Sequence, residues 1–355
     1  MAAEASRPLN EPLNLPLTLA EWRTYEDGRS LWESLRSRFQ AAGLELWAHA
    51  YYSTAKAPLN VNSPRQNGYL FAHTLRQDIK NVRIGFLGYL RIFQYKNTLF
   101  RPARTSEGQD VRLRVIVVNG EGQDHLRILR RLATGPVSLI SGNHTLPLLR
   151  EVELGRVVFG VFPMVGSSMA ESAAPWPRNS VQDILELLMQ ALEGLAFIHK
   201  MGIAHRDAFL DNFLVQWQPE SLLTEDLFSS RPRVYLIDFE VAVEFPAFTP
   251  PEQRICYGLP VGGSFPNEDE YGRPSPPDVL EGQGYDPFKL DVWQLTHDVI
   301  FRKFVVGDAE IDGLMQALCT DNADQRISAE AALGQMTLAV ESATRSCLKA
   351  LAVWK

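Results

Sequence analysis

The sequence is poor in cysteine and has no excess of positive charge. Its 355 residues contain three cysteines, Cys256, Cys319 and Cys347, none of which forms a CxxC pair. We therefore expect three free thiols in a reducing compartment, without a disulfide framework or a cysteine metal site. The formal charge of −7 argues against nucleic acid or an anionic membrane as the main partner, because both bind through clustered Lys and Arg.

Long apolar runs are also missing. The apolar stretch 157–165 is far shorter than the roughly 20 residues of a transmembrane helix, and the N-terminus carries no apolar signal region. We expect no membrane partner and an intracellular protein, cytoplasmic or nuclear. The chain is 45% hydrophobic and 22% charged, which is typical of a globular protein with a substantial core.

One short run carries oxygen ligands at the spacing that phosphoryl transfer uses. The tripeptide His205-Arg206-Asp207 is followed by Asn212, and Asp238 comes after a β-rich segment further along. The pattern resembles a protein-kinase catalytic centre. This resemblance implies that Asp207 is the catalytic base, while Asn212 and Asp238 are the metal ligands for magnesium.

The residues around this run fit the same resemblance. Residues 181–199 predict an amphipathic helix, with Asn179 or Ser180 as its cap and Gly202 just past its end. Residues 234–237 predict a strand immediately before Asp238. A helix followed by both motifs is much rarer by chance than either motif alone.

The order of predicted elements indicates an α+β, two-lobed, protein-kinase-like fold. Residues 1–80 predict an N-terminal extension, with a helix that opens at Ser30 and an irregular linker. Residues 81–163 predict a small β-rich lobe, with a strand over 111–118 and a helix over 123–132. Residues 164–355 predict the larger helical lobe, with the catalytic loop, the activation segment and the terminal helices.

Further positions match the protein-kinase superfamily, and the sequence of these motifs resembles that of the diverged fungal kinase-like families. Asp278 of Pro276-Pro277-Asp278 lies where the family has the glutamate of Ala-Pro-Glu, and Arg326 lies where an arginine pairs with that acid. Asp291 opens the segment that resembles the central helix of the large lobe. The resemblance implies that Asp291 holds the backbone of the catalytic loop.

The same resemblance implies a nucleotide site. The carbonyl of Pro163 and the amide of Val165 would meet the adenine edge, with Phe162 at the back of the pocket. Arg114 replaces the lysine that contacts the α- and β-phosphates, so it is assigned to cofactor binding and catalysis. An acid should pair with Arg114, and Asp124 is the preferred candidate.

Several departures from the family pattern weaken the predicted catalytic equipment. No GxGxxG loop precedes Arg114. Phe209 stands where serine/threonine kinases carry a lysine, and Asp211 stands where tyrosine kinases carry an arginine, so a cation beside the γ-phosphate is missing. Glu240 replaces the glycine that follows Asp238-Phe239.

The resulting hypothesis is an ATP- and Mg-dependent protein kinase-like phosphotransferase that transfers the γ-phosphate to a protein hydroxyl, Ser/Thr rather than Tyr. One alternative is a pseudokinase that binds or scaffolds; another is a small-molecule kinase of the choline or aminoglycoside type. The expected partner is a protein substrate or a regulatory protein, and the oligomeric state stays open. The hydroxyls between Glu240 and Pro277 are candidate phosphosites read by Arg206: Tyr257, Ser264, Tyr271 and Ser275.

Overall fold

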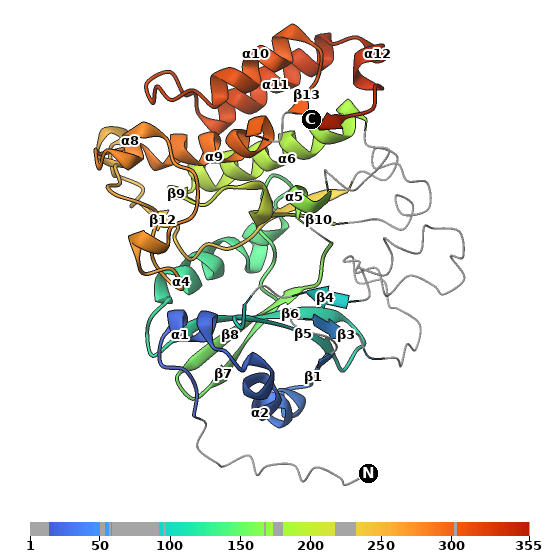
Figure 1. Ribbon diagram of the computed structural model, residues 1–355, viewed down its shortest axis with the longest axis vertical. Coiled ribbons are helices and arrows are strands. Elements are labelled where there is room, and N and C mark those ends of the chain that lie inside the picture. Colours follow the sequence, from blue (N-terminus) through green and yellow to red (C-terminus); the bar gives the residue numbers. More distant parts are fainter. Residues whose placement is uncertain are drawn as a thin grey trace. The chain divides into compact units, whose positions relative to one another are not determined.

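The protein is an α+β fold with two compact units (Figure 1). The computed structural model describes residues 14–49, 54–56, 58, 92–94, 97–166, 168–172, 180–216, 232–301 and 304–354. The first unit comes from residues up to Leu126 and from 148–164, and the second from 127–147 and from Val165 onwards. The α+β class expected from the sequence is confirmed.

The first unit is built on a five-stranded antiparallel sheet. Its strands follow the spatial order β1 (Leu44–Leu46), β5 (Phe100–Thr105), β6 (Asp110–Val118), β8 (Val157–Pro163), β7 (Arg150–Leu154). The central strand β6 has the sequence DVRLRVIVV, whose β-branched residues favour a pleated and largely buried surface. A register shift between Val115 and Val117 marks an irregularity in its pairing with β8.

One face of this sheet carries the core of the first unit. Alternate residues of β6 point to that face, as the two-residue period of a strand requires, and they pack with α1 (Leu19–Thr24) and α2 (Gly28–Ala41). Four buried aromatic rings meet there with centroids 5.0 to 6.0 Å apart: Trp22, Trp32, Phe39 and Phe159. Both helices lie in the segment expected as an N-terminal extension, and they share the core of the sheet.

The start of α2 differs from the sequence prediction. The helix begins at Gly28, because the carboxylate of Asp27 accepts a hydrogen bond of 3.0 Å from the amide of Ser30. Ser30 therefore lies in the first turn and is not the cap. An aspartate three residues earlier satisfies the free amides equally well.

The segment predicted as an irregular linker contains one short strand among its described residues. β3 (Thr54–Lys56) pairs with β2 (Ala48–His49) and with β4 (Ile92–Gln94). Apart from Pro58, the rest of that linker lies outside the described residues, as do residues 1–13. The helix predicted over 123–132 is confirmed as α4 (Gln123–Leu132).

The second unit is helical. Its long helix α6 (Val181–Lys200) begins with a reciprocal capping box between Ser180 and Asp183, which satisfies two free amides. Its other helices are α5 (Met169–Ser172), α8 (Pro277–Leu280), α9 (Pro287–Phe301), α10 (Ala309–Leu318), α11 (Ala329–Ser342) and α12 (Arg345–Leu348). The 3₁₀ turns are η2 (Gly135–Leu139), η3 (Leu210–Asn212), η4 (Pro251–Gln253) and η5 (Glu268–Glu270).

Short antiparallel pairs of strands complete the second unit. They are β9 (Ile203–Ala204) with β12 (Val243–Glu244), β10 (Phe213–Gln216) with β11 (Arg233–Leu236), and β13 (Phe304–Val305) with β14 (Val353–Trp354). In β12, Glu244 forms ion pairs with Arg127 and Arg131. These pairs tie the C-terminal half of α4 to β12.

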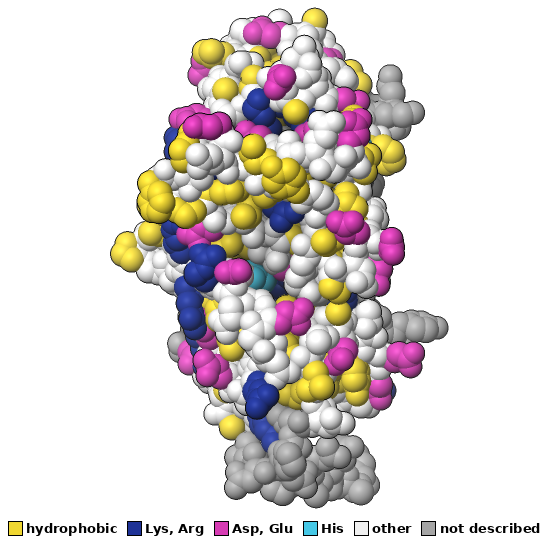
Figure 2. All heavy atoms as spheres, turned by 90° about the vertical axis from the view of Figure 1, so that its left-hand side faces the viewer, with side chains coloured by type: hydrophobic (Ala, Val, Ile, Leu, Met, Phe, Trp, Pro, Cys, Tyr) yellow, Lys and Arg dark blue, Asp and Glu magenta, His cyan; other side chains and the backbone are white. Residues whose placement is uncertain are grey.

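The surface and the thiols agree with the composition. Figure 2 shows acidic side chains scattered among hydrophobic and basic ones on the face that it draws. All three cysteines are free thiols, as expected. In the part of the chain that the structure describes, no helix combines the length and the apolar character of a membrane span.

Candidate active site

The catalytic loop begins where α6 ends. Gly202 has a φ of +76°, and a Cβ built on it would lie 2.8 Å from the carbonyl oxygen of Phe245. Both the left-handed backbone and the close approach favour glycine at this position. The chain then passes through β9 and delivers His205 to the loop.

A buried carboxylate on α9 fixes the first residues of the loop. Asp291 is fully buried and accepts hydrogen bonds from the amides of His205 (2.7 Å) and Arg206 (2.6 Å). The ring of His199 contacts the same carboxylate at 2.8 Å. The predicted role of Asp291 in holding the loop backbone is confirmed.

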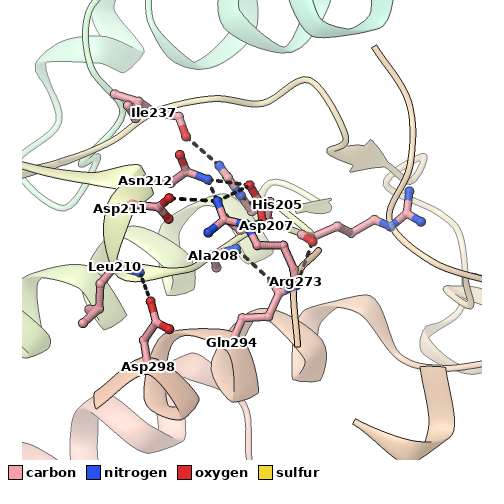
Figure 3. A network of polar contacts seen from close by, with 11 residues as sticks. His205, Asp207, Ala208, Leu210, Asp211, Asn212, Ile237, Arg273, Gln294 and Asp298 are labelled. Carbon is pink, nitrogen blue, oxygen red and sulfur yellow. Dashed lines mark hydrogen bonds and ion pairs between the residues drawn. The ribbon is translucent and has the colours of Figure 1, made fainter. Parts of the chain in front are cut away.

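Two more side chains of α9 also form hydrogen bonds with the backbone of the loop. Gln294 accepts a 2.8 Å hydrogen bond from the amide of Ala208 and donates one of 2.8 Å to the carbonyl of Arg206. Asp298 accepts a 3.1 Å hydrogen bond from the amide of Leu210. Positions 291, 294 and 298 lie on one face of a helix, so α9 presents a polar row to the loop backbone. Figure 3 shows two members of this row, Gln294 and Asp298.

His205 is a buried and neutral connector. Its Nε2 donates to the carbonyl of Ile237 at 2.8 Å, and its Nδ1 accepts from the amide of Asp207 at 3.3 Å. Burial lowers the pKa of His205, which agrees with a ring that uses one nitrogen as donor and the other as acceptor. The ring also meets Phe239 edge to face, with centroids 4.9 Å apart.

Asp207 lies at the centre of the network. The side-chain amide of Asn212 donates to the carboxylate of Asp207 at 2.7 Å and to its backbone carbonyl at 2.8 Å. Burial, with the nearby carboxylates of Asp238 and Asp211, raises the pKa of Asp207 to about 8, although Arg273 and Asn212 act in the opposite direction. A carboxylate in this environment is a stronger base than one in water.

The β10–β11 hairpin brings Asn212 and Asp238 towards each other. Phe213 pairs with Leu236, and the amide of Ile237 donates to the carbonyl of Asn212 at 2.9 Å. Asp238 follows directly, with a φ of +70°, a conformation that is costly for a residue other than glycine and is common at functional sites. The two proposed metal ligands therefore stand at the same end of one hairpin.

The donor set has the chemistry that suits magnesium. Mg²⁺ prefers hard oxygen ligands and is usually bound by one or two carboxylates together with substrate phosphates. Asn212 and Asp238 would supply such oxygens. No group of three or more His, Cys, Asp or Glu side chains forms a metal site by itself within the described ranges, so phosphate oxygens would have to complete the coordination.

An arginine that the sequence analysis did not single out enters the same site. Arg273, from the segment before α8, forms ion pairs with Asp207 (3.3 Å) and Asp211 (2.9 Å). Its guanidinium carbon lies 4.9 Å from the centroid of the Phe209 ring. The loop therefore meets a cation that comes from another part of the chain (Figure 3).

The stretch between Glu240 and Pro277 has its own fixed points. Glu240 accepts hydrogen bonds from the amide of Ser264 (3.1 Å) and from its hydroxyl (2.9 and 3.1 Å). Ser264 is only 1% exposed, so it is a buried partner of Glu240 and not an accessible phosphosite.

Arg206 is occupied by neutral groups. Its guanidinium donates to the carbonyls of Val241 (3.3 Å) and Leu259 (3.4 Å) and to the hydroxyl of Tyr285 (3.2 Å). The backbone of Arg206 has a φ of +65°. Arg206, which the sequence predicts to bind a phosphorylated side chain, is thus hydrogen-bonded to other groups in the unphosphorylated protein.

The predicted pair of Asp278 and Arg326 is present. Arg326 donates to the carboxylate at 2.7 and 3.3 Å and also to the carbonyls of Thr320 and Asp321. Its side chain is fully buried. Since all three guanidinium nitrogens of Arg326 donate to an oxygen, its buried charge is well compensated.

The predicted nucleotide residues occupy β8 and its neighbours. Arg114 on β6 faces Gly160 across the strand pair, and Phe162 lies two residues further along β8 on the same side. Arg114 is only 5% exposed, and its guanidinium carbon lies 4.9 Å from the centroid of the Phe100 ring. Arg114 and Phe162 therefore share the sheet face opposite the aromatic core.

The other residues predicted to contact the adenine follow in order along the chain. Pro163 ends β8, and Val165 comes two residues later; both are buried. Asp124 lies in the first turn of α4. The roles of Pro163, Val165 and Arg114 towards a nucleotide, and of Asp124 towards Arg114, stay predictions.

Sequence reasoning missed Gln294, Asp298 and Arg273. The first two had a signal, because their spacing from Asp291 repeats one face of a helix that is otherwise apolar. Arg273 had none, since it lies 66 residues from Asp207 in a segment without a regular period.

In the helical unit, this aspartate, asparagine and second aspartate lie on one loop and one strand pair. This arrangement resembles the catalytic centre of protein kinases. Comparison with known proteins agrees. The chain is 30% identical over 121 residues to serine/threonine-protein kinase ksp1 of Schizosaccharomyces pombe, which covers 34% of this chain and 21% of that protein.

Two other kinases of the same organism are similar over segments of like size. Serine/threonine-protein kinase ppk8 is 35% identical over 108 residues, 30% of this chain and 17% of ppk8. Serine/threonine-protein kinase oca2 is 36% identical over 116 residues, 33% of this chain and 14% of oca2. No family model matches the chain. The similarity supports a kinase-like relationship over about a third of the chain, and the matches cover no more than 21% of these relatives.

Proposed function

We propose that the protein is a phosphotransferase of the protein-kinase type, which transfers the γ-phosphate of ATP to a serine or threonine hydroxyl of a protein. The observation that carries this proposal is the placement of Asp207. The amide of Asn212 orients its carboxylate at 2.7 Å, and the polar row of α9 holds the backbone on both sides of it.

The proposed chemistry gives each residue of the loop a separate task. Asp207, in its ionised form, accepts the proton of the attacking hydroxyl. Asn212 keeps the carboxylate in position. Bound magnesium would neutralise charge on the phosphates, with Asn212 and Asp238 as its protein ligands. Arg114 keeps its assignment to the phosphates, and Phe162, Pro163 and Val165 to the adenine, on the strength of the resemblance.

A pseudokinase is the second candidate, because Arg273 contacts both oxygens of the Asp207 carboxylate. A base held in this way would accept a proton only if the arginine moved aside or found a phosphate. The small-molecule kinase alternative is less favoured, since Asp291 and the pair of Asp278 with Arg326 follow the protein-kinase pattern.

The test combines nucleotide binding with phosphate transfer. We expect Mg-ATP to raise the melting temperature of the protein, and Asp238→Asn to remove the magnesium-dependent part of that rise. We expect slow incorporation of labelled γ-phosphate into the protein itself or into peptides, at least about tenfold slower in Asp207→Asn. Binding without incorporation above the Asp207→Asn background would select the pseudokinase, and transfer only to amino-alcohols or aminoglycosides would select the small-molecule kinase.

A further inference from the structure

The two unusual residues of the catalytic loop, Phe209 and Asp211, both contact the same side chain. The guanidinium of Arg273 lies over the ring of Phe209, with 4.9 Å between the guanidinium carbon and the ring centroid. The same group forms a 2.9 Å ion pair with Asp211. A cation over an aromatic face and next to a carboxylate is stabilised by both.

Phe209 and Asp211 together therefore form a binding surface for an arginine side chain. A lysine at position 209 would repel Arg273 and would remove the flat surface under it, and an arginine at position 211 would remove the ion pair. The two departures from the kinase pattern are compatible with one another and with Arg273. Considered separately, each departure is the loss of a cationic side chain from the loop.

Arg273 also has a nitrogen to spare. Nε and Nη2 make the contacts with Asp207 and Asp211. Nη1 makes no hydrogen bond to any residue that the structure describes, and the side chain is 34% exposed. A guanidinium can donate from all three nitrogens. Nη1 of Arg273 can therefore bind an oxyanion while the side chain keeps its contacts with Phe209 and Asp211.

We infer that Arg273 supplies, from the segment before α8, the positive charge that the catalytic loop lacks at Phe209, and that its ligand is the terminal phosphoryl group of the bound nucleotide. This inference rests on the proposed function. Asp207, Asp211 and Asp238 bring three carboxylates to the site, and an anionic phosphoryl group beside them needs a fixed cation. Arg273 delivers that cation next to the base, where the transfer takes place.

The first experiment measures binding and needs no turnover. Isothermal titration compares Mg-AMPPNP, which has a third phosphate, with Mg-ADP, which lacks it. We expect Arg273→Gln to weaken AMPPNP binding about tenfold, as the loss of one charged hydrogen bond would, and to leave ADP binding unchanged. The double variant Phe209→Lys with Arg273→Gln should recover most of the loss.

The second experiment measures transfer in the same variants. We expect Arg273→Gln to be at least about tenfold slower than the parent, Arg273→Lys to lie between them, and the double variant to regain activity. Phe209→Lys alone should give no gain, because it places a second cation against Arg273. Arg254→Gln is the matched control: it removes a charge from the same stretch, where Arg254 donates to the carbonyl of Thr249 at 2.8 Å.

The outcomes separate the two claims. If the parent binds nucleotide but Arg273→Gln affects AMPPNP and ADP alike, or affects neither, the role of Arg273 is refuted and the proposed function stands. Faster transfer in Arg273→Gln would also refute it, because the arginine would then block Asp207. If the parent binds neither nucleotide, the proposed function fails and this inference fails with it.

Discussion

Arg326 holds the carboxylate of Asp278, 48 residues earlier in the chain, through hydrogen bonds of 2.7 and 3.3 Å. Arg326 is fully buried, whereas Asp278 keeps 17% of its side chain exposed. The pair therefore depends most on the arginine, whose charge has no access to water.

Removing one member of this pair should be costly. We expect Arg326→Ala to lower the free energy of unfolding, measured by urea titration, by about 3–5 kcal/mol, because Asp278 and two backbone carbonyls lose their donor. Lys200→Ala is the control, since the pair of Lys200 with Glu330 is 61% and 67% exposed and should be worth at most about 1 kcal/mol. Equal effects of the two variants would contradict the burial argument.

The attachment of the loop to α9 makes a second prediction. Gln294→Leu leaves the buried amide of Ala208 and carbonyl of Arg206 without partners, so we expect a loss of about 2 kcal/mol in unfolding free energy. Because Asp207 lies between those residues, phosphate transfer should fall as well. Thr296→Val, which removes the hydrogen bonds of the Thr296 hydroxyl to the carbonyls of Val292 and Trp293 in α9, leaves the loop contacts intact and should have the smaller effect on both measurements.

Glu240 and Ser264 should be energetically coupled. Each of Glu240→Ala and Ser264→Ala is expected to destabilise by about 1–3 kcal/mol, and the double variant by little more than one of them. A double-mutant cycle in urea should give a coupling energy above about 0.5 kcal/mol. The exposed pair of Asn267 with Glu270 is the control, with a coupling near zero. Additive effects at Glu240 and Ser264 would argue that their contact contributes nothing.

His205 should make stability depend on pH. Its pKa is lowered in the folded protein, so below about pH 6.5 the unfolded chain binds a proton that the folded one does not. The contribution of neutral His205 to the free energy of unfolding is fully present above that pH and is lost as the solution is acidified. We expect unfolding free energies measured between pH 7 and pH 5 to decline less steeply in His205→Gln, by up to about 1.4 kcal/mol per pH unit. Identical slopes would show that the pKa of His205 is the same in the folded and the unfolded chain, so that its burial does not lower it.

Much of the fold and part of the candidate site could be predicted, because their signals are local. The helix α6 has a capping residue, an apolar face and a terminal glycine within one stretch of sequence. The separation of Asp207 and Asn212 by five residues is long enough for the amide to turn back onto the carboxylate. These features need no knowledge of distant residues.

Other features depend on contacts that the sequence does not display. The start of α2 was misplaced because two acceptors, Asp27 and Ser30, stand within three residues, and packing decides between them. Trp22 and Phe159 meet in one core although more than a hundred residues separate them in the sequence. Arg273 reaches the loop from an irregular segment, where no periodicity marks which side chains turn inwards.

The contacts of Arg206 have a consequence for how such a protein is controlled. Two backbone carbonyls and Tyr285 already engage the guanidinium, and Glu240 already holds Ser264. In the unmodified chain, the contacts of Arg206 and Glu240 therefore already hold parts of this segment in place. A phosphate introduced into this segment would have to displace these partners before Arg206 could bind it.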